Sequence, residues 1–413
     1  MSEGTQGVPD VAGAAAGAAE TVSSWARAGR HAGFAGAAIG VVAAGAAAGV
    51  ALERLTVGRG VRRKARMALD SAGPYGSLRG TPGTAYGDDG TALYYEVDEV
   101  DDRPDGEGQG ARRKRLLGAL GRRSAAPTVV FCHGYCLTQD AWHFQRAALR
   151  GRVRTVHWDQ RSHGRSARGH AQIEGTDPVT IDMLGRDLKA VLDAAVPEGP
   201  IVLVGHSMGG MTVMALADQF PEYVAERVVG VGLIGTSAGR LSEVAFGLPS
   251  LGVKAFHRFA PGVLKALGAQ SELVEKGRRA TADLFAGLVK RYSFGAPKDV
   301  DPGVARFAER LIEATPIDVV AEFFPAFAVH DKTGALAAYD GVPALVLAGD
   351  RDLITPAEHS HTIGELLPAA ELVCVPDAGH LVMLEHPELV NDRLTSLVER
   401  AVAEARSRRP ARA

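Results

Sequence analysis

Residues 201–210 read Ile-Val-Leu-Val-Gly-His-Ser-Met-Gly-Gly, and this stretch decides the fold. The four apolar residues predict a buried strand, and the pattern Gly-x-Ser-x-Gly that follows predicts a sharp turn into a helix. A turn of this kind presents the hydroxyl of Ser207 at the end of the strand. A serine hydroxyl is a weak nucleophile by itself, so nucleophilic catalysis requires a base, an acid and an oxyanion site elsewhere in the chain.

The candidate acid and base each follow a later apolar run, in the chain order serine, aspartate, histidine that such a turn predicts. Asp352 lies in the loop after the first run, and His380 ends the loop after the second. We expect His380 to take the proton of Ser207, because imidazole titrates near neutral pH. Asp352 would hold the tautomer of His380 and stabilise the imidazolium that forms.

Other residues of the right type leave alternatives open. Asp350 is the competing acid, since it leaves the same strand two residues before Asp352. The competing histidines are His359, His361 and His386, whose positions are typical of exposed helix and cap residues.

An oxyanion site needs hydrogen-bond donors aimed at the charge that develops during acyl transfer. The N–H of Met208, directly after the nucleophile, is one candidate. The apolar run 127–132, followed by His133-Gly134-Tyr135, provides a second loop, and the N–H of Tyr135 is the other candidate. The Tyr135 side chain could instead form a wall of the pocket. His133 and His206 each precede a turn residue, which favours structural hydrogen bonds over catalytic roles.

These motifs together resemble the α/β-hydrolase family from about residue 86 to residue 405. The resemblance rests on His133-Gly134, the stretch Asp-Gln-Arg-Ser-His-Gly-Arg-Ser at 159–166, the turn at Ser207, Gly349-x-x-Asp352 and Gly379-His380. It implies an α/β fold with an eight-stranded, mostly parallel sheet, flanking helices and a helical cap insertion. It also implies catalytic roles for Ser207, Asp352 and His380. The form Gly-His-Ser-Met-Gly-Gly is similar to that of monoacylglycerol lipases and carboxylesterases, whereas relatives that cleave epoxides or haloalkanes carry aspartate at this turn.

Composition excludes several other functions. A net charge of −2 over 413 residues gives no general attraction to nucleic acid. The glycine spacing matches no phosphate loop and no dinucleotide-binding motif, so no cofactor is expected. Three cysteines suggest no disulfide framework. Cys132-His133-x-x-Cys136 lacks a second pair of ligands, so no metal is expected and these thiols are interpreted as buried or pocket-lining.

Alternating strand and helix patterns place the hydrolase core at residues 85–239 and 342–405. Residues 240–341 exceed what this core needs, and helical patterns dominate in them. The family resemblance implies that an insertion here is a cap over the active site. The cap holds nine of the 13 phenylalanines of the chain: Phe246, Phe256, Phe259, Phe285, Phe294, Phe307, Phe323, Phe324 and Phe327. Most should pack between helices, but some should line an apolar pocket facing Ser207, which favours a hydrophobic ester as the small-molecule substrate.

The N-terminal region suggests an attachment to the membrane. Residues 1–30 are rich in Ala, Gly and Ser and are expected to be disordered. Residues 31–53 form a candidate transmembrane helix, since the run 32–52 carries no charge. This run holds 10 Ala and 5 Gly, so a flexible segment or a surface helix is the alternative. The basic linker 54–84 would place the enzyme on the cytoplasmic face of a membrane, crossed once; without a span it would be cytoplasmic.

The sequence thus predicts a serine esterase or lipase that works through an acyl-enzyme on Ser207. An acyltransferase or a cofactor-free perhydrolase on the same triad is the enzymatic alternative, and a non-catalytic ligand-binding protein is the third. Oligomeric state is left open. A basic tail, residues 406–413, is expected to be frayed at the end of the core.

Overall fold

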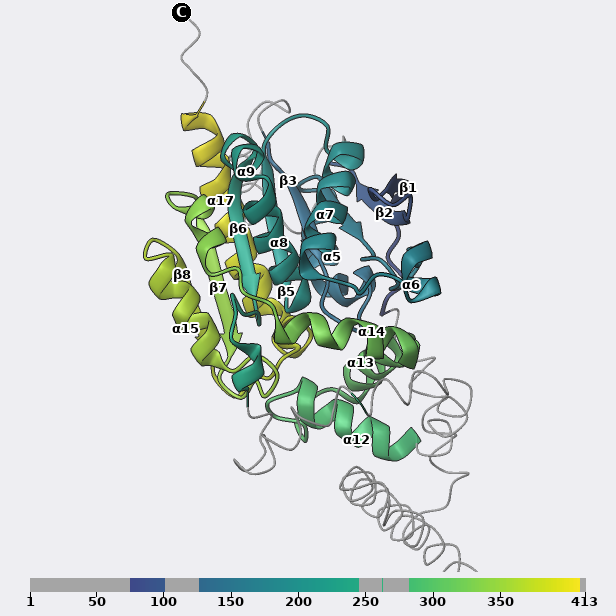
Figure 1. Ribbon diagram of the computed structural model, residues 1–413. Helices are drawn as coiled ribbons and strands as arrows, with labels where there is room; N and C mark the ends of the chain where they lie inside the picture. Colours follow the sequence, from purple (N-terminus) through teal and green to yellow (C-terminus); the bar gives the residue numbers. More distant parts are fainter. Residues whose placement is uncertain (1–74, 101–125, 245–261, 263–281, 409–413) are drawn as a thin grey trace, which may run out of the picture. The chain divides into compact units, whose positions relative to one another are not determined.

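Eight strands form one sheet in the computed structural model, which describes residues 75–100, 126–244, 262 and 282–408 (Figure 1). Their order across the sheet is β1-β2-β4-β3-β5-β6-β7-β8. The strands are β1 (Thr81–Tyr86), β2 (Ala92–Asp98), β3 (Thr128–Cys132), β4 (Thr155–Trp158), β5 (Ile201–His206), β6 (Val228–Ile234), β7 (Ala344–Gly349) and β8 (Glu371–Val375).

Only β2 runs against its neighbours: it pairs antiparallel with both β1 and β4, and all other pairs are parallel. The prediction of an eight-stranded, mostly parallel sheet is therefore confirmed. Since β3, β5, β6, β7 and β8 run in one direction, the loops that follow them meet at one edge of the sheet. Ligands of open α/β sheets bind at that edge.

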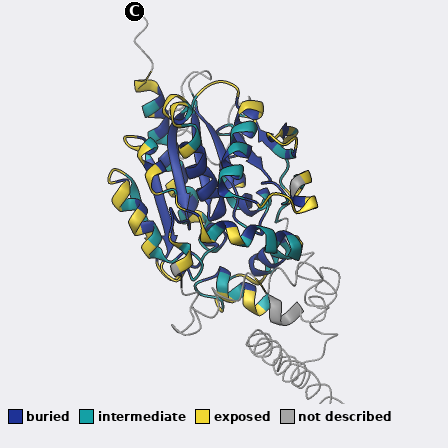
Figure 2. Ribbon diagram, in the orientation of Figure 1, coloured by how far each residue is buried: buried dark blue, intermediate teal, exposed yellow. Residues whose placement is uncertain are grey.

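Helices cover both faces of the sheet because alternate strand residues point to opposite sides. In β5, Val202 and Val204 belong to one apolar cluster, whereas Ile201 and Leu203 belong to another. Strands β3 to β7 are buried along their whole length, whereas the edge strands β1 and β8 are partly exposed. Many exposed residues lie on the outer sides of the helices (Figure 2). One face carries α5 (His143–Leu149), α16 (Val382–Glu385) and α17 (Pro387–Ser407); the other carries α7 (Ile181–Ala195), α8 (Met208–Gln219), α9 (Pro221–Arg227) and α15 (Ala357–Leu366).

Helix α7 shows how the sequence pattern produces this packing. The Thr180 hydroxyl accepts a hydrogen bond from the Met183 N–H, which caps the start of the helix. Five apolar residues at helical spacing share one face, and all are buried: Ile181, Leu184, Leu188, Val191 and Leu192. Each such buried aliphatic side chain contributes about 1.5–3 kcal/mol to folding, which is why this helix stays on the sheet.

Two expected boundaries of the core are wrong. The sheet begins at Thr81 rather than at 85, so the last residues assigned to the basic linker pair with β2. Pro82 and Gly83 hide this strand, because neither favours a strand on its own. At the other end α17 continues to Ser407, and the guanidinium of Arg408 donates to the carbonyls of Ala225 and Val228. The start of the expected frayed tail is thus packed on the core.

The segment expected to form the cap contains α12 (Ala282–Ser293), α13 (Pro302–Glu313) and α14 (Ile317–Ala328). Its last part, the short helix η4 (Gly334–Tyr339), packs on the sheet face instead, where the hydroxyl of buried Tyr339 donates to the Val213 carbonyl in α8 at 2.8 Å. Two further elements are short: α6 (His170–Glu174) follows β4, and η3 (Leu241–Glu243) follows β6.

Several predictions concern residues outside the described ranges: the disordered segment 1–30, the candidate transmembrane helix 31–53, most of the linker 54–84, and residues 245–261, 263–281 and 409–413. Within the described residues, no helix has the length and apolar character that crossing a membrane requires.

A buried ion pair joins α7 to the loop after β4. The Arg161 guanidinium donates to both carboxylate oxygens of Asp187, at 2.5 and 2.6 Å, and both side chains are almost fully buried. The same guanidinium also pairs with the partly exposed Asp89 at 2.9 Å. Removing Asp187 therefore takes away two buried charge-assisted hydrogen bonds but leaves Arg161 one anionic partner.

We expect Asp187→Ala to lower the free energy of unfolding by about 2–3 kcal/mol, measured by urea denaturation, because the lost hydrogen bonds are buried and charged while Asp89 still pairs with Arg161. Asp193→Ala is the control on the same helix, since its pair with Lys189 is solvent-exposed. This control should lose at most about 0.5 kcal/mol. Equal losses for the two variants would contradict the assignment of the Arg161 pair as a buried structural bond.

Candidate active site

Ser207 occupies the turn between β5 and α8, as expected. Its backbone has φ 54° and ψ −120°, a conformation that residues with a side chain rarely adopt. Close packing holds the turn: a Cβ on Gly209 would collide with the main-chain carbonyl of Cys132 in β3. A strained backbone persists only where the surroundings enforce it, and such positions gather at functional sites.

Asp352 and His380 meet at the ends of β7 and β8. The Nδ1 atom of His380 lies 2.8 Å from the Asp352 Oδ2 atom. The other carboxylate oxygen, Oδ1, accepts the N–H groups of Ile354 at 2.8 Å and Thr355 at 2.9 Å. With these bonds the carboxylate is buried and held in one orientation, as a residue that orients an imidazole must be.

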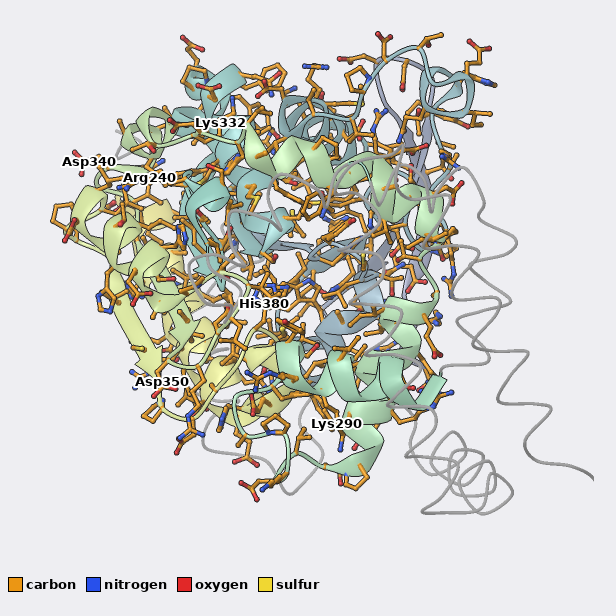
Figure 3. The ribbon with its side chains drawn as sticks, turned by 60° about the horizontal axis from the view of Figure 1, so that its bottom comes forward. Arg240, Lys290, Lys332, Asp340, Asp350 and His380 are labelled. Atoms are coloured by element: carbon orange, nitrogen blue, oxygen red, sulfur yellow. The ribbon has the colours of Figure 1, made fainter. Side chains whose placement is uncertain are left out.

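Asp350, the competing acid, is exposed, and its N–H donates to the Val375 carbonyl as a strand-end residue. Figure 3 shows it at the periphery of the sheet edge, away from His380. Since Asp352 bonds the histidine, the structure places the aspartate–histidine pair where the sequence suggested.

His206, the last residue of β5, links the end of the strand that precedes Ser207 to the loop of His380. The Nε2 atom of His206 lies 2.9 Å from the His380 carbonyl oxygen, and the two rings are 4.8 Å apart between centroids. No hydrogen bond joins the Ser207 hydroxyl to the His380 ring among the described residues. Catalytic hydrogen bonds are often long before substrate binds.

Both candidate oxyanion donors are available. Met208 is the first residue of α8, where an N–H has no partner within the helix. The N–H of Tyr135 donates to none of the described residues. The Tyr135 side chain also takes the alternative role, because it lines the cavity at Ser207.

Buried histidines hold the loops of the site as structural residues. Nε2 of His133 accepts the Gln160 N–H at 2.9 Å, so Nδ1 carries the proton and donates to the Gly134 carbonyl at 2.8 Å. Burial lowers the pKa of His133 to about 4, and the pKa of His206 well below its usual value. Both rings are therefore neutral at pH 7.

The competing histidines lie elsewhere. His359 is half-buried, contrary to the exposed position expected, and its Nδ1 atom lies 2.8 Å from the Ser237 hydroxyl. His361 is exposed, and half-buried His386 precedes α17.

An apolar cavity of about 180 Å³ opens at Ser207. Phe324 and Phe327 of α14 line it, whereas Phe294, Phe307 and Phe323 are buried in apolar clusters. The remaining walls are Tyr135, Met211, Leu241, Ser242, Ala328, Ile354 and Thr355. For these five phenylalanines, some line an apolar pocket at Ser207 while others pack in the core, as expected.

Both cysteines of the stretch Cys132-His133-x-x-Cys136 are buried thiols. Cys132 is buried and its Sγ atom lies 3.3 Å from the Trp158 indole nitrogen. Burial raises the pKa of this thiol to about 12, so it is protonated at neutral pH. No group of three potential metal ligands occurs among the described residues.

Two residues that order these loops were not predicted from the sequence. The hydroxyl of Thr355 lies 2.9 Å from Asp352 Oδ2 and 3.2 Å from His380 Nδ1. Glu385 accepts the N–H of Gly379 at 2.7 Å beside the histidine. Neither could be found from sequence, because each acts through contacts that the fold creates.

The chain belongs to the alpha/beta hydrolase fold family, which matches residues 127–387. It is similar to the sn-1-specific diacylglycerol lipase ABHD11 of Mus musculus, at 28% identity over 66% of this chain and 81% of that protein. It is also similar to 3-oxoadipate enol-lactonase 1 of Acinetobacter baylyi, at 27% identity over 64% of this chain and 85% of that protein.

Solved structures agree with the fold. A thermophilic esterase from Thermogutta terrifontis aligns with a TM-score of 0.56 and 22% identity, over 78% of this chain and 98% of that one. The family and these relatives support a hydrolase activity on esters.

Glu385 gives a test of how the histidine loop is held. Besides Gly379, its carboxylate accepts the N–H groups of Gly295 at 3.1 Å and Ala296 at 3.0 Å, just after α12. One side chain thus joins the end of a cap helix to the loop that carries His380.

We expect Glu385→Ala to lower the free energy of unfolding by about 2 kcal/mol, because it leaves three N–H groups without their acceptor. Urea denaturation measures the loss, and Glu388→Ala, an exposed glutamate on α17, is the control with little expected change. A Glu385 variant as stable as this control would show that the carboxylate does not hold the loop.

Proposed function

We propose that this protein is a serine hydrolase that cleaves a carboxylic ester of apolar character through an acyl-enzyme on Ser207. The observation that carries the proposal is the Asp352–His380 hydrogen bond beside a strained serine at the mouth of an apolar cavity. These are the three groups that nucleophilic acyl transfer requires, each on a different loop of one sheet edge.

The proposed reaction uses each group in turn. His380 Nε2 accepts the Ser207 proton as the hydroxyl oxygen attacks the ester carbonyl, and Asp352 stabilises the imidazolium at Nδ1. The N–H groups of Met208 and Tyr135 donate to the resulting oxyanion. The C–O bond to the alcohol then breaks, and His380 gives the alcohol its proton. Water attacks the acyl-enzyme by the same steps, which releases the acid and restores the Ser207 hydroxyl.

Replacement of the nucleophile tests this reaction. We expect Ser207→Ala to reduce turnover of an aryl ester by at least about 10³-fold, since loss of a catalytic serine removes the covalent path. Labelling by a fluorophosphonate probe should also vanish. Ser407→Ala, at the end of α17, is the control and should turn over and label like the parent.

Labelling, turnover and product analysis together separate the serine hydrolase from its functional alternatives. A folded parent that neither labels nor turns over esters would indicate a non-catalytic ligand-binding protein. A labelled parent whose products include esters of an added alcohol, or peracids with added peroxide, would indicate an acyltransferase or a perhydrolase.

The size of the cavity argues for a small acyl group. An apolar protein cavity of about 150 Å³ holds benzene, so a cavity of about 180 Å³ suits an acyl chain of roughly six carbons. Phe327 occupies one wall, where its ring would stop a longer chain.

We expect kcat/KM for a graded series of p-nitrophenyl esters to peak at or below about six acyl carbons. Phe327→Ala should move the peak to longer chains, because it opens the wall. Phe220→Ala, which removes a half-buried phenyl group at the far end of α8, is the control. An unchanged chain-length profile in the Phe327 variant would contradict the placement of the acyl group in this cavity.

Attachment to the cytoplasmic face of a membrane through residues 32–52 remains part of the proposal and rests on the sequence alone. A membrane position would suit an enzyme with an apolar substrate, since such esters concentrate in lipid.

A further inference from the structure

Tyr135 connects two parts of the proposed site. Its main chain lies in the loop between β3 and α5, and its N–H is a proposed oxyanion donor. Its side chain reaches across the cavity, and its hydroxyl donates to the Val320 carbonyl in α14. The ring lies 5.0 Å from the Phe327 ring in an edge-to-face contact and 6.2 Å from the Phe323 ring. One residue therefore spans from the oxyanion site to a cavity wall.

Hydrogen bonds of the adjacent residues Gly134 and Cys136 hold the main chain around Tyr135. The Gly134 carbonyl accepts from His133 at 2.8 Å and from the Leu137 N–H at 3.2 Å, and the Cys136 N–H donates to His163 at 3.2 Å. The Gly134 carbonyl and the Tyr135 N–H belong to one planar, trans peptide group and point in opposite directions. Any tilt of this peptide changes the aim of the Tyr135 N–H, so the anchoring of the residue's other end matters.

Helix α14 provides that other anchor. It lies at the end of the sheet where β5 ends, and its residues Phe324, Phe327 and Ala328 line the cavity (Figure 1). Arg168 of the core forms ion pairs with Asp318 and Glu322, which holds the first half of α14. Tyr135 bonds the helix between these two acidic positions. Contacts that hold α14 against the core therefore also influence the position of the Tyr135 side chain.

We propose that Tyr135 is a positioning residue. Its hydroxyl, bonded to the Val320 carbonyl, couples the orientation of the Tyr135 N–H to the position of α14 over the cavity. The proposal rests on the serine-hydrolase function above. An acyl group in the cavity contacts Phe324 and Phe327 and so stabilises the position of α14 against the core. Through the Tyr135 hydroxyl, this also stabilises the orientation of the Tyr135 N–H during acyl transfer. The transition state gains from this more than the bound ester does, because the oxyanion forms only during reaction.

Tyr135→Phe removes the hydroxyl and keeps the ring that lines the cavity. We expect kcat to fall by about 5- to 20-fold, a fraction of the loss caused by deleting an oxyanion donor, with KM within about twofold of the parent. A trifluoromethyl ketone, which forms an oxyanion adduct with the serine, should bind more weakly by the same factor as kcat/KM.

Tyr339→Phe is the matched control. It also deletes a phenol that donates to a helix carbonyl, that of Val213, but its buried site lies on the sheet face and not at the cavity. This variant should keep the kcat and inhibitor affinity of the parent, and thermal melts of both variants report any general loss of stability.

Three results would overturn the inference: a Tyr135→Phe variant with parental kcat, one that changes only KM, or equal losses of kcat in the two tyrosine variants. Each presupposes that the parent turns over esters and loses this activity in Ser207→Ala. Failure of that first condition would overturn the proposed function instead, so the two failures are distinguishable.

Discussion

The site depends on one backbone constraint, the left-handed conformation of Ser207 between β5 and α8. The conformation is unfavourable for a residue with a side chain, so the packing around it must supply the energy. Gly209 permits this packing, because its missing Cβ lets α8 approach the Cys132 carbonyl. The same turn leaves the Met208 N–H without a helix partner. The proposed nucleophile and one proposed oxyanion donor are thus products of a single turn.

Around this turn, buried polar groups hold the loops that no secondary structure holds. His133 and His206 stay neutral because burial lowers the pKa of each. The neutral ring of His133 donates one hydrogen bond and accepts another, so it joins two main-chain segments without adding a charge. His206 bonds the His380 carbonyl through Nε2. Two N–H groups and a hydroxyl surround the Asp352 side chain and fix its orientation. His133 and His206 therefore serve as structural residues, whereas His380 is the histidine that bonds Asp352.

Local patterns predicted a large part of the molecule. The alternation of apolar runs and amphipathic helices gave β3, β5, β7, β8 and the buried face of α7 their correct places. The start of β1 was missed, because Pro82 and Gly83 carry no strand signal and only pairing with β2 makes them a strand. Thr355 and Glu385 were missed for a related reason, since their partners lie on other loops.

By itself, the sequence determined the chain order of Ser207, Asp352 and His380 and the strands that precede them, since strand, turn and helix signals are local. It left open whether Asp350 or Asp352 serves the histidine, and whether Tyr135 offers its main chain or its side chain. The tertiary structure shows that Asp352 is the buried partner of His380 and that the Tyr135 side chain lines the cavity, whereas the oxyanion role of the Tyr135 N–H belongs to the proposed function. The cavity size also emerged only there. The physical reason is that these features depend on distances between loops, which only the packed sheet edge sets.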